Sequence, residues 1–121
     1  MPKTVLIVDD SLAMRRMIAF TLEASGYQVL QGGTGVEGLQ LFDMQPADII
    51  IADLNMPEMD GITFVKNIRE RPAGQGIPIL MLTTENLNSR VKEGREAGAT
   101  GWLIKPFKPE RLVEVIGRVL G

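Results

Sequence analysis

Short apolar runs recur along the chain, each followed by polar residues. In order they are Thr4–Val8, Tyr27–Leu30, Asp48–Ala52, Ile79–Leu82 and Trp102–Ile104. Most of them are continuously apolar rather than alternating, which is typical of parallel strands covered on both faces. The run Tyr27–Leu30 is more mixed in character, so we expect it to form an edge strand.

The segments between these runs have the apolar period and the end signals of amphipathic helices. Their predicted first residues or N-caps are Ser11, Thr34, Asp60, Asn86 and Pro109, and their predicted stops include Gly26, Pro46 and Pro72. Thr34 and Glu37 match a capping box. The helix after Asn86 contains Gly94, which costs about 1 kcal/mol relative to Ala in a helix interior. We interpret that helix as weakly held; close packing against Gly94 is the alternative.

Strand and helix thus alternate along the whole chain. With right-handed crossovers, this order predicts an α/β fold in which helices cover both faces of an open parallel sheet. The 121 residues have the size of one domain, which we expect to span 1–121. No apolar run approaches the roughly 20 residues that span a bilayer, and the N-terminus has no signal-peptide pattern. We therefore expect a cytoplasmic protein.

Composition and charge narrow the chemistry. The chain has no His and no Cys, which excludes a Ser-His-Asp triad, a Cys nucleophile, disulfides and His or thiolate metal ligands. The net charge of −2 argues against non-specific binding to nucleic acid. Residues 1–60 carry 3 basic and 9 acidic side chains, whereas residues 61–121 carry 10 basic and 6 acidic ones. An acidic site in the first half and a basic face in the second are therefore expected.

Reactive side chains follow four of the five predicted strands. Asp9 and Asp10 follow the first, Asp53 the third, Thr83 the fourth and Lys105 the fifth. Ligands of such sheets bind at the carboxyl ends of the strands. If the strands adopt the order 2-1-3-4-5, three carboxylates converge, and they repel one another unless a cation such as Mg²⁺ lies between them. With a lysine and a hydroxyl beside them, they are the components of phosphoryl transfer onto Asp.

The same positions carry an extended motif: Asp9-Asp10, DLNMPEMDG from Asp53 to Gly61, Thr83, and Lys105-Pro106-Phe107. In this combination the chain resembles the receiver domain of bacterial response regulators, above all those of the single-domain chemotaxis type. The resemblance covers essentially the whole sequence. It implies a flavodoxin-like, doubly wound (βα)5 fold with a five-stranded parallel sheet of order 2-1-3-4-5.

The resemblance also implies roles for individual residues. Asp53 would accept a phosphoryl group from a histidine kinase, with Lys105 paired to that group or to Asp53. The implied ligands of Mg²⁺ are Asp9, Asp10, Asp53 and the backbone carbonyl of Asn55. Thr83 and Trp102 occupy the switch positions of the family, although its switch aromatic is usually Tyr or Phe. The peptide bond between Lys105 and Pro106 is expected to be cis.

Further expectations concern phosphate lifetime and partners. The side chains expected to tune hydrolysis are Asn55, Thr84 and Glu85. The implied partner face lies on the last two helices and the strand between them, with Arg90, Arg95, Trp102, Lys108 and Arg111. The partners implied are a histidine kinase of the chemotaxis type and a flagellar motor switch protein or another protein target. A monomer is expected that catalyses only its own phosphorylation and dephosphorylation, without nucleic-acid binding or membrane insertion.

Four other functions are weighed against this one. A flavodoxin-like cofactor binder needs a phosphate-binding loop after its first strand, where this chain has Asp9-Asp10. A haloacid-dehalogenase-type phosphatase carries a second Asp two positions after its nucleophile, where this chain has Asn55. A transcriptional regulator needs a DNA-binding domain, and no helix-turn-helix is expected after the last helix. A phosphorelay shuttle would differ only in its partner.

Overall fold

The computed structural model of the protein describes residues 2–84 and 88–120. Its strands are β1 (Thr4–Val8), β2 (Gln28–Gly32), β3 (Ile49–Asp53), β4 (Ile79–Thr83) and β5 (Gly101–Ile104). Its α-helices are α1 (Leu12–Ala24), α2 (Gly35–Met44), α3 (Gly61–Glu70), α4 (Asn88–Ala97) and α5 (Pro109–Leu120). A short 3₁₀ helix, η1 (Pro72–Gly74), follows α3.

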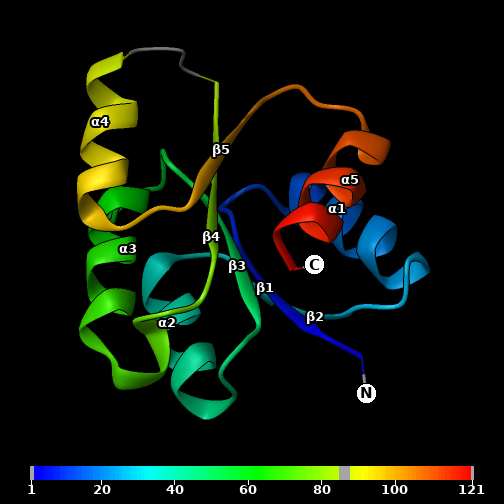
Figure 1. Ribbon diagram of the computed structural model, residues 1–121, viewed down its shortest axis with the longest axis horizontal. Helices are drawn as coiled ribbons and strands as arrows, with labels where there is room; N and C mark the ends of the chain where they lie inside the picture. The colour runs from blue at the N-terminus through cyan, green and yellow to red at the C-terminus, as the bar shows by residue number, and fades with distance from the viewer. Residues whose placement is uncertain (1, 85–87, 121) are drawn as a thin grey trace.

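The strands form one parallel sheet in the order β2-β1-β3-β4-β5, which confirms the predicted doubly wound fold. Figure 1 shows the sheet nearly edge-on, with α2, α3 and α4 on one face and α1 and α5 on the other. The strands β3, β4 and β5 run toward the top of this view, where their carboxyl ends lie. In the part of the chain described, no helix is long and apolar enough to cross a membrane.

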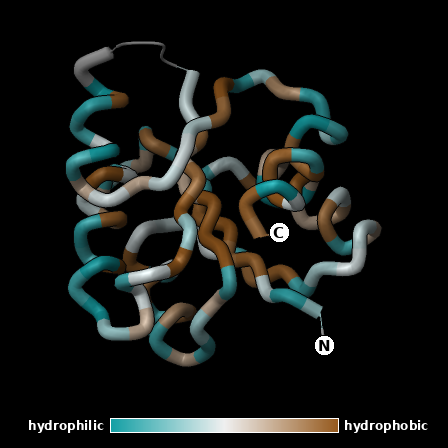
Figure 2. The backbone as a smooth tube through the Cα atoms, in the orientation of Figure 1, coloured by the Kyte–Doolittle hydropathy of each residue, from teal (hydrophilic) through white to brown (hydrophobic). Residues whose placement is uncertain are grey.

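Two apolar cores, one on each face of the sheet, explain the unbroken apolar runs. Leu6 and Val8 of β1 belong to the core under α2 and α3, whereas Val5 and Ile7 belong to the core under α1 and α5. All four side chains are fully buried. Because successive residues of a strand point to opposite faces, a strand covered on both sides must be apolar at every position. Figure 2 shows this hydrophobic centre in brown.

The strand bounds differ slightly from the predicted ones because pairing, rather than hydropathy, sets them. β2 is an edge strand as predicted, but it spans Gln28–Gly32 because each of its residues pairs with one of Thr4–Val8. β3 spans Ile49–Asp53, since Asp53 itself pairs with Leu82 of β4. Asp53 therefore lies within the sheet rather than after it.

The predicted helix caps at Ser11, Thr34 and Asp60 are confirmed, because each side chain accepts a backbone N–H of the following turn. The capping box differs from the usual pattern in one respect. The Glu37 carboxylate accepts the N–H of Gly33 at 2.9 Å, one residue before the expected donor. The predicted cap Asn86 lies outside the described residues.

Helix α4 is held against the rest of the fold by side-chain contacts that the sequence pattern does not predict. Gly94 is buried against Trp102, because a methyl group on Gly94 would lie 2.8 Å from Cη2 of that ring. At the carboxyl end of α4, Arg69 of α3 donates to the carbonyl oxygen of Gly98 from Nε at 3.1 Å and from Nη2 at 2.6 Å. The contact with Trp102 favours close packing as the explanation of Gly94, while the bonds from Arg69 hold the end of the helix.

Candidate functional site at the carboxyl edge of the sheet

Three carboxylates converge where β1 and β3 end. The two strands are neighbours, and their register pairs Val8 with Ala52, so Asp9 and Asp53 follow side by side. Asp10 comes from the loop after β1. One carboxylate oxygen from each of these three residues lies within 4.8 Å of the other two. The convergence expected from parallel strands is therefore present.

Asp9 is held on all sides. Its side chain is fully buried. Its Oδ1 accepts the N–H of Ser11 at 2.8 Å, and its Oδ2 accepts Nζ of Lys105 at 3.0 Å. Its backbone N–H donates to the carbonyl oxygen of Gly32 at 3.1 Å, and its own carbonyl oxygen accepts Nη1 of Arg15 at 2.7 Å. The residue is thereby fixed both through its backbone and through its carboxylate.

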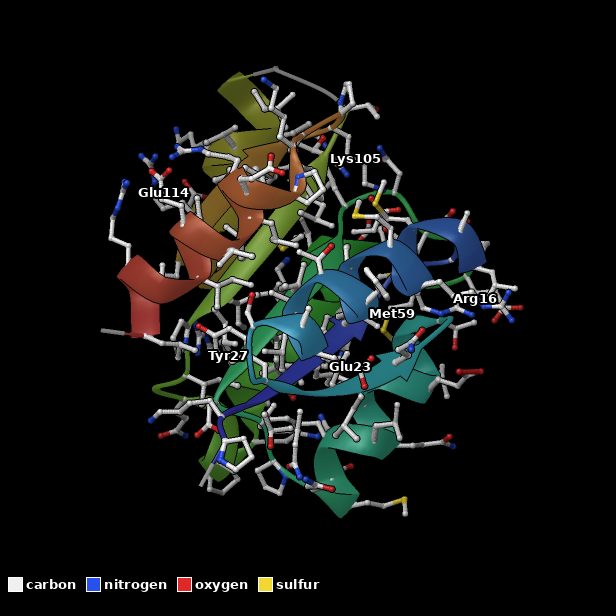
Figure 3. The ribbon with its side chains drawn as sticks, turned by 90° about the vertical axis from the view of Figure 1, so that its right-hand side faces the viewer. Arg16, Glu23, Tyr27, Met59, Lys105 and Glu114 are labelled. Carbon is white, nitrogen blue, oxygen red and sulfur yellow. The ribbon has the colours of Figure 1, made fainter. Side chains whose placement is uncertain are left out.

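Lys105 brings a positive charge to this cluster from the end of β5. Its Nζ lies 3.0 Å from Oδ2 of Asp9 and 3.4 Å from Oδ1 of Asp53. Figure 3 labels Lys105 among the side chains at the carboxyl edge of the sheet. Although burial opposes it, hydrogen bonding to Asp9 and the charges of both aspartates raise the pKa of Lys105. The peptide bond before Pro106 is cis, as expected.

The Asp53 carboxyl has too little positive charge around it. Burial, followed by the charge of Asp9, raises the pKa of Asp53 from 3.8 to about 6. Lys105 and the backbone N–H of Asn55 act in the opposite direction but do not compensate. Mg²⁺ prefers carboxylate and carbonyl oxygen ligands. This donor set fits that ion. In addition to Lys105, a bound Mg²⁺ would be a second source of positive charge and would remove the repulsion between the carboxylates.

The other predicted site residues lie on neighbouring elements. Thr83 is buried at the end of β4, two residues after Met81 and therefore on the same face of the sheet. Trp102 of β5 pairs with Met81 of β4 and packs against the core of that face. Thr83 and Trp102 thus both face the α4 side of the sheet. Asn55 and Thr84 are exposed, and Glu85 lies outside the described residues.

The residues of the predicted partner face surround the β5 edge without forming one cluster. Arg90 and Arg95 belong to α4 on one face of the sheet, and Arg111 belongs to α5 on the other. Lys108 is exposed just before α5. Arg111 and Trp102 line the same cleft between β5 and α5. Arg90 and Arg111 also form exposed ion pairs with Glu93 and Glu114 of their own helices.

Two arginines at important positions were not predicted from the sequence. Arg15 binds the backbone of Asp9, and Arg69 binds the backbone at the end of α4. A signal exists for Arg15, because helical side chains lean toward the N-terminus of their helix. An arginine in the first turns of a helix that follows a strand can therefore reach back to that strand's end.

Comparison with known proteins assigns the family. Residues 5–117 match the response regulator receiver domain. The chain belongs to this family. The receiver domain is 41% identical over 119 residues to the chemotaxis protein CheY1 of Helicobacter pylori, covering 97% of this chain and 96% of that protein. It is 40% identical to a CheY homologue of Campylobacter jejuni, covering 97% and 92% of the two chains.

Solved structures agree with this assignment. The chemotaxis response regulator CheY4 of Vibrio cholerae is 44% identical, covers 98% of this chain and 99% of its own, and has a TM-score of 0.95. The receiver domain of sensor histidine kinase PA1611 of Pseudomonas aeruginosa has a magnesium ion coordinated in its active-site cleft. It is 28% identical, with a TM-score of 0.91 and coverage of 100% and 99%. The protein is therefore a CheY-like receiver domain of a response regulator.

Membership also carries the general chemistry of the family. CheY-like receiver domains take a phosphoryl group from histidine kinases and bind protein targets. Receiver domains bind Mg²⁺ in an acidic active site, and the acidic cluster of this chain consists of Asp9, Asp10 and Asp53.

Proposed function

We propose that this receiver domain is a chemotaxis-type switch that takes a phosphoryl group onto Asp53 from a CheA-like histidine kinase. The observation that carries the proposal is the cluster of Asp9, Asp10 and Asp53 within 4.8 Å, with Lys105 ion-paired to two of them. The similarity to chemotaxis proteins over nearly the whole chain supports the signalling role.

Asp53 is the nucleophile of the proposed reaction. One carboxylate oxygen attacks the phosphorus of a phosphohistidine, the P–O bond forms as the P–N bond breaks, and the leaving imidazole takes up a proton. The Lys105 ammonium would exchange its contact with Asp53 for one with the incoming phosphoryl oxygens. Its ion pair with Asp9 would be retained. When the switch is turned off, water attacks the phosphorus and the bond between phosphorus and the Asp53 oxygen breaks. Inorganic phosphate and a proton are released, and Asp53 is again a carboxylate.

Asp9, Asp10, Asp53 and the backbone carbonyl of Asn55 would hold Mg²⁺ in this site. The ion supplies electrostatic stabilisation of the charge that develops on the transferred group. The chain supplies the positions: Asp9 is fixed by its four hydrogen-bond partners, and Asp53 is fixed by its place in β3. Asn55 lies two residues after Asp53 and the exposed Thr84 directly after Thr83, and together with Glu85 they would set the access of water.

We propose that the structural change caused by phosphorylation is transmitted to the partner surface through β4 and β5. A phosphoryl group adds charge and hydrogen-bond acceptors, and the hydroxyl of Thr83 would turn to donate to it. Thr83 faces the same side of the sheet as Trp102, whose ring lies against Gly94 of α4. A shift of Thr83 would therefore change the packing between β5 and α4.

The partner surface would then be Arg90, Arg95, Trp102, Lys108 and Arg111 around β5. Its basic side chains favour an acidic or amphipathic partner. We propose that the partner is a flagellar motor switch protein, with a single-domain phosphorelay role as the alternative. Pull-down with the phosphorylated protein tests this choice. Recovery of a phosphotransfer protein without any motor component would favour the phosphorelay role.

The first experiment tests the chemistry. The protein is incubated with acetyl phosphate in Mg²⁺ or in EDTA, and intact mass and Trp102 fluorescence are followed. We expect one phosphoryl group per chain in Mg²⁺ only, together with a change in emission from the only tryptophan. Asp53→Asn should abolish both signals.

Asp43→Asn is the matched control, because Asp43 is an exposed aspartate of α2 outside the cluster. It should be phosphorylated like the wild type. Phosphorylation of the Asp53→Asn variant, or of the wild type in EDTA, would refute the proposed nucleophile or the metal requirement. Phosphorylation without any change in emission would keep the chemistry but refute the route through Trp102.

A further inference from the structure

Arg15 makes a contact with the acidic site that its charge alone would not predict. Its Nη1 donates to the backbone carbonyl oxygen of Asp9 at 2.7 Å, a short hydrogen bond from a charged donor. Arg15 belongs to the second turn of α1 and is half-buried. The guanidinium thus lies beside a cluster of carboxylates, yet this bond is to the main chain.

The guanidinium also rests on the loop between β2 and α2. A methyl group on Gly33 would lie 3.1 Å from Nη1 and 3.5 Å from Cζ of Arg15, so the guanidinium packs closely on this part of the loop. The N–H of Gly33 is in turn bound by the Glu37 carboxylate at 2.9 Å. Arg15 therefore contacts two loops, one through Gly33 and the other through the carbonyl oxygen of Asp9.

The bonded oxygen belongs to the peptide unit that joins Asp9 to Asp10. Because a peptide unit is planar, fixing its oxygen also fixes the direction of its N–H and the position of the next Cα. Asp10 is the exposed member of the cluster, while Asp9 and Asp53 are already held by burial and strand pairing. Among the three carboxylates, Asp10 depends most on the orientation of this peptide unit.

We propose that Arg15 is a positioning residue for the metal site: it holds the Asp9–Asp10 peptide unit so that the Asp10 carboxylate points into the cluster. The inference rests on the proposed Mg²⁺ site. A positioning role and a purely electrostatic role for Arg15 predict opposite changes in Mg²⁺ affinity when Arg15 is replaced. A nearby positive charge repels a divalent cation, so removing the charge alone strengthens Mg²⁺ binding. Removing a support of the ligands weakens it, typically by 10-fold or more.

The test is calorimetric titration of four proteins with Mg²⁺ alone, without a phosphodonor. They are the wild type, Arg15→Gln, Arg15→Lys and Arg16→Gln. Arg16 is the matched control, because it is the neighbouring arginine of α1 and its side chain is exposed (Figure 3). Arg16→Gln removes the same charge close by without touching the Asp9 carbonyl.

We expect Arg15→Gln to weaken Mg²⁺ binding by about 10-fold. Arg16→Gln should leave it unchanged or slightly tighter, and Arg15→Lys, which keeps the charge and a donor, should lie between the wild type and Arg15→Gln. Each protein is first shown to be folded by circular dichroism. If Arg15→Gln does not fold, the comparison of Arg15→Lys with Arg16→Gln still tests the inference. Arg15→Lys keeps the charge, so weaker Mg²⁺ binding in this variant reports loss of positioning, whereas Arg16→Gln reports the loss of a nearby charge alone.

The outcomes separate this inference from the function on which it rests. Tighter or unchanged binding in Arg15→Gln, while the wild type binds Mg²⁺, would overturn the role of Arg15 and leave the metal site intact. Absence of Mg²⁺ binding by the wild type would overturn both. Raising the salt concentration adds a further criterion, since a charge effect is screened, whereas the loss in Arg15→Gln should persist.

Discussion

Replacing Gly94 with Ala sets two effects of opposite sign against each other. Inside a helix, Ala is favoured over Gly by about 1 kcal/mol. At this position, however, the added methyl group would lie 2.8 Å from Cη2 of Trp102, well inside an ordinary carbon contact of about 3.5–4.0 Å. Forcing a methyl group into a packed site costs about 1–3 kcal/mol. We therefore expect Gly94→Ala to lower the free energy of unfolding by about 0–2 kcal/mol and to displace the Trp102 ring.

Gly117 provides the matched control. It lies inside α5, and nothing is found within 4 Å of a methyl group added there. Gly117→Ala should therefore raise the free energy of unfolding by about 1 kcal/mol. Since the helix-propensity gain is common to both variants, the difference between them, about 1–3 kcal/mol, isolates the contact with Trp102.

Urea unfolding followed by circular dichroism measures both variants, and emission from Trp102 reports the ring itself. A shift of the Gly94→Ala emission toward that of a solvent-exposed indole is expected. The clash disappears in a Trp102→Ala background, where Gly94→Ala should gain about as much as Gly117→Ala. Equal stabilisation by the two Gly→Ala changes in the wild-type background, with unchanged emission, would refute the contact.

Three further predictions concern the site and a helix cap. Because the pKa of Asp53 is raised from 3.8 to about 6, the folded state binds more protons than the unfolded state between these values, and stability falls as the pH rises through that window. Without Mg²⁺, Asp53→Asn should therefore raise the free energy of unfolding at pH 7.5 by about 1–3 kcal/mol. Urea titrations measure this gain, and an equal gain at pH 3.5 and at pH 7.5 would contradict the prediction. Lys105→Met should destabilise the protein at pH 7.5 by about 3–5 kcal/mol, because it leaves the buried Asp9 charge unpaired; adding Asp9→Asn should recover most of the loss. Asp60→Ala should cost about 1 kcal/mol in thermal unfolding, since it removes an acceptor 2.8 Å from the N–H of Thr63, whereas Asp60→Ser should cost little.

The order of elements and the convergence of the site could be predicted because both follow from parallel strands. Apolar runs covered on two faces are conspicuous in a sequence, and the residue after each run must lie at the same edge of the sheet. Asp9, Asp10, Asp53 and Lys105 therefore required no knowledge of side-chain packing to be placed together. The strand order itself came with the family resemblance, which the structure confirms.

Contacts to backbone carbonyls could not be predicted in the same way. Arg15 and Arg69 bind carbonyl oxygens of Asp9, Gly74, Ile77 and Gly98. Every residue has a carbonyl group, so the acceptor leaves no mark in the sequence. A carboxylate partner, in contrast, has an identity that can be matched with a basic residue by spacing.

Gly94 shows why helix propensity alone gives an incomplete account of α4. Propensity treats glycine as a loss to the helix, and from this the sequence predicted a weakly held element. In the fold, the missing Cβ lets the indole of Trp102 lie against the helix, and burial of an aromatic ring contributes more than the propensity of one residue. The sign of the effect depends on what faces Gly94, and that neighbour comes from a strand eight residues further along the chain. A similar glycine without such a neighbour, Gly117 of α5, retains the ordinary propensity loss.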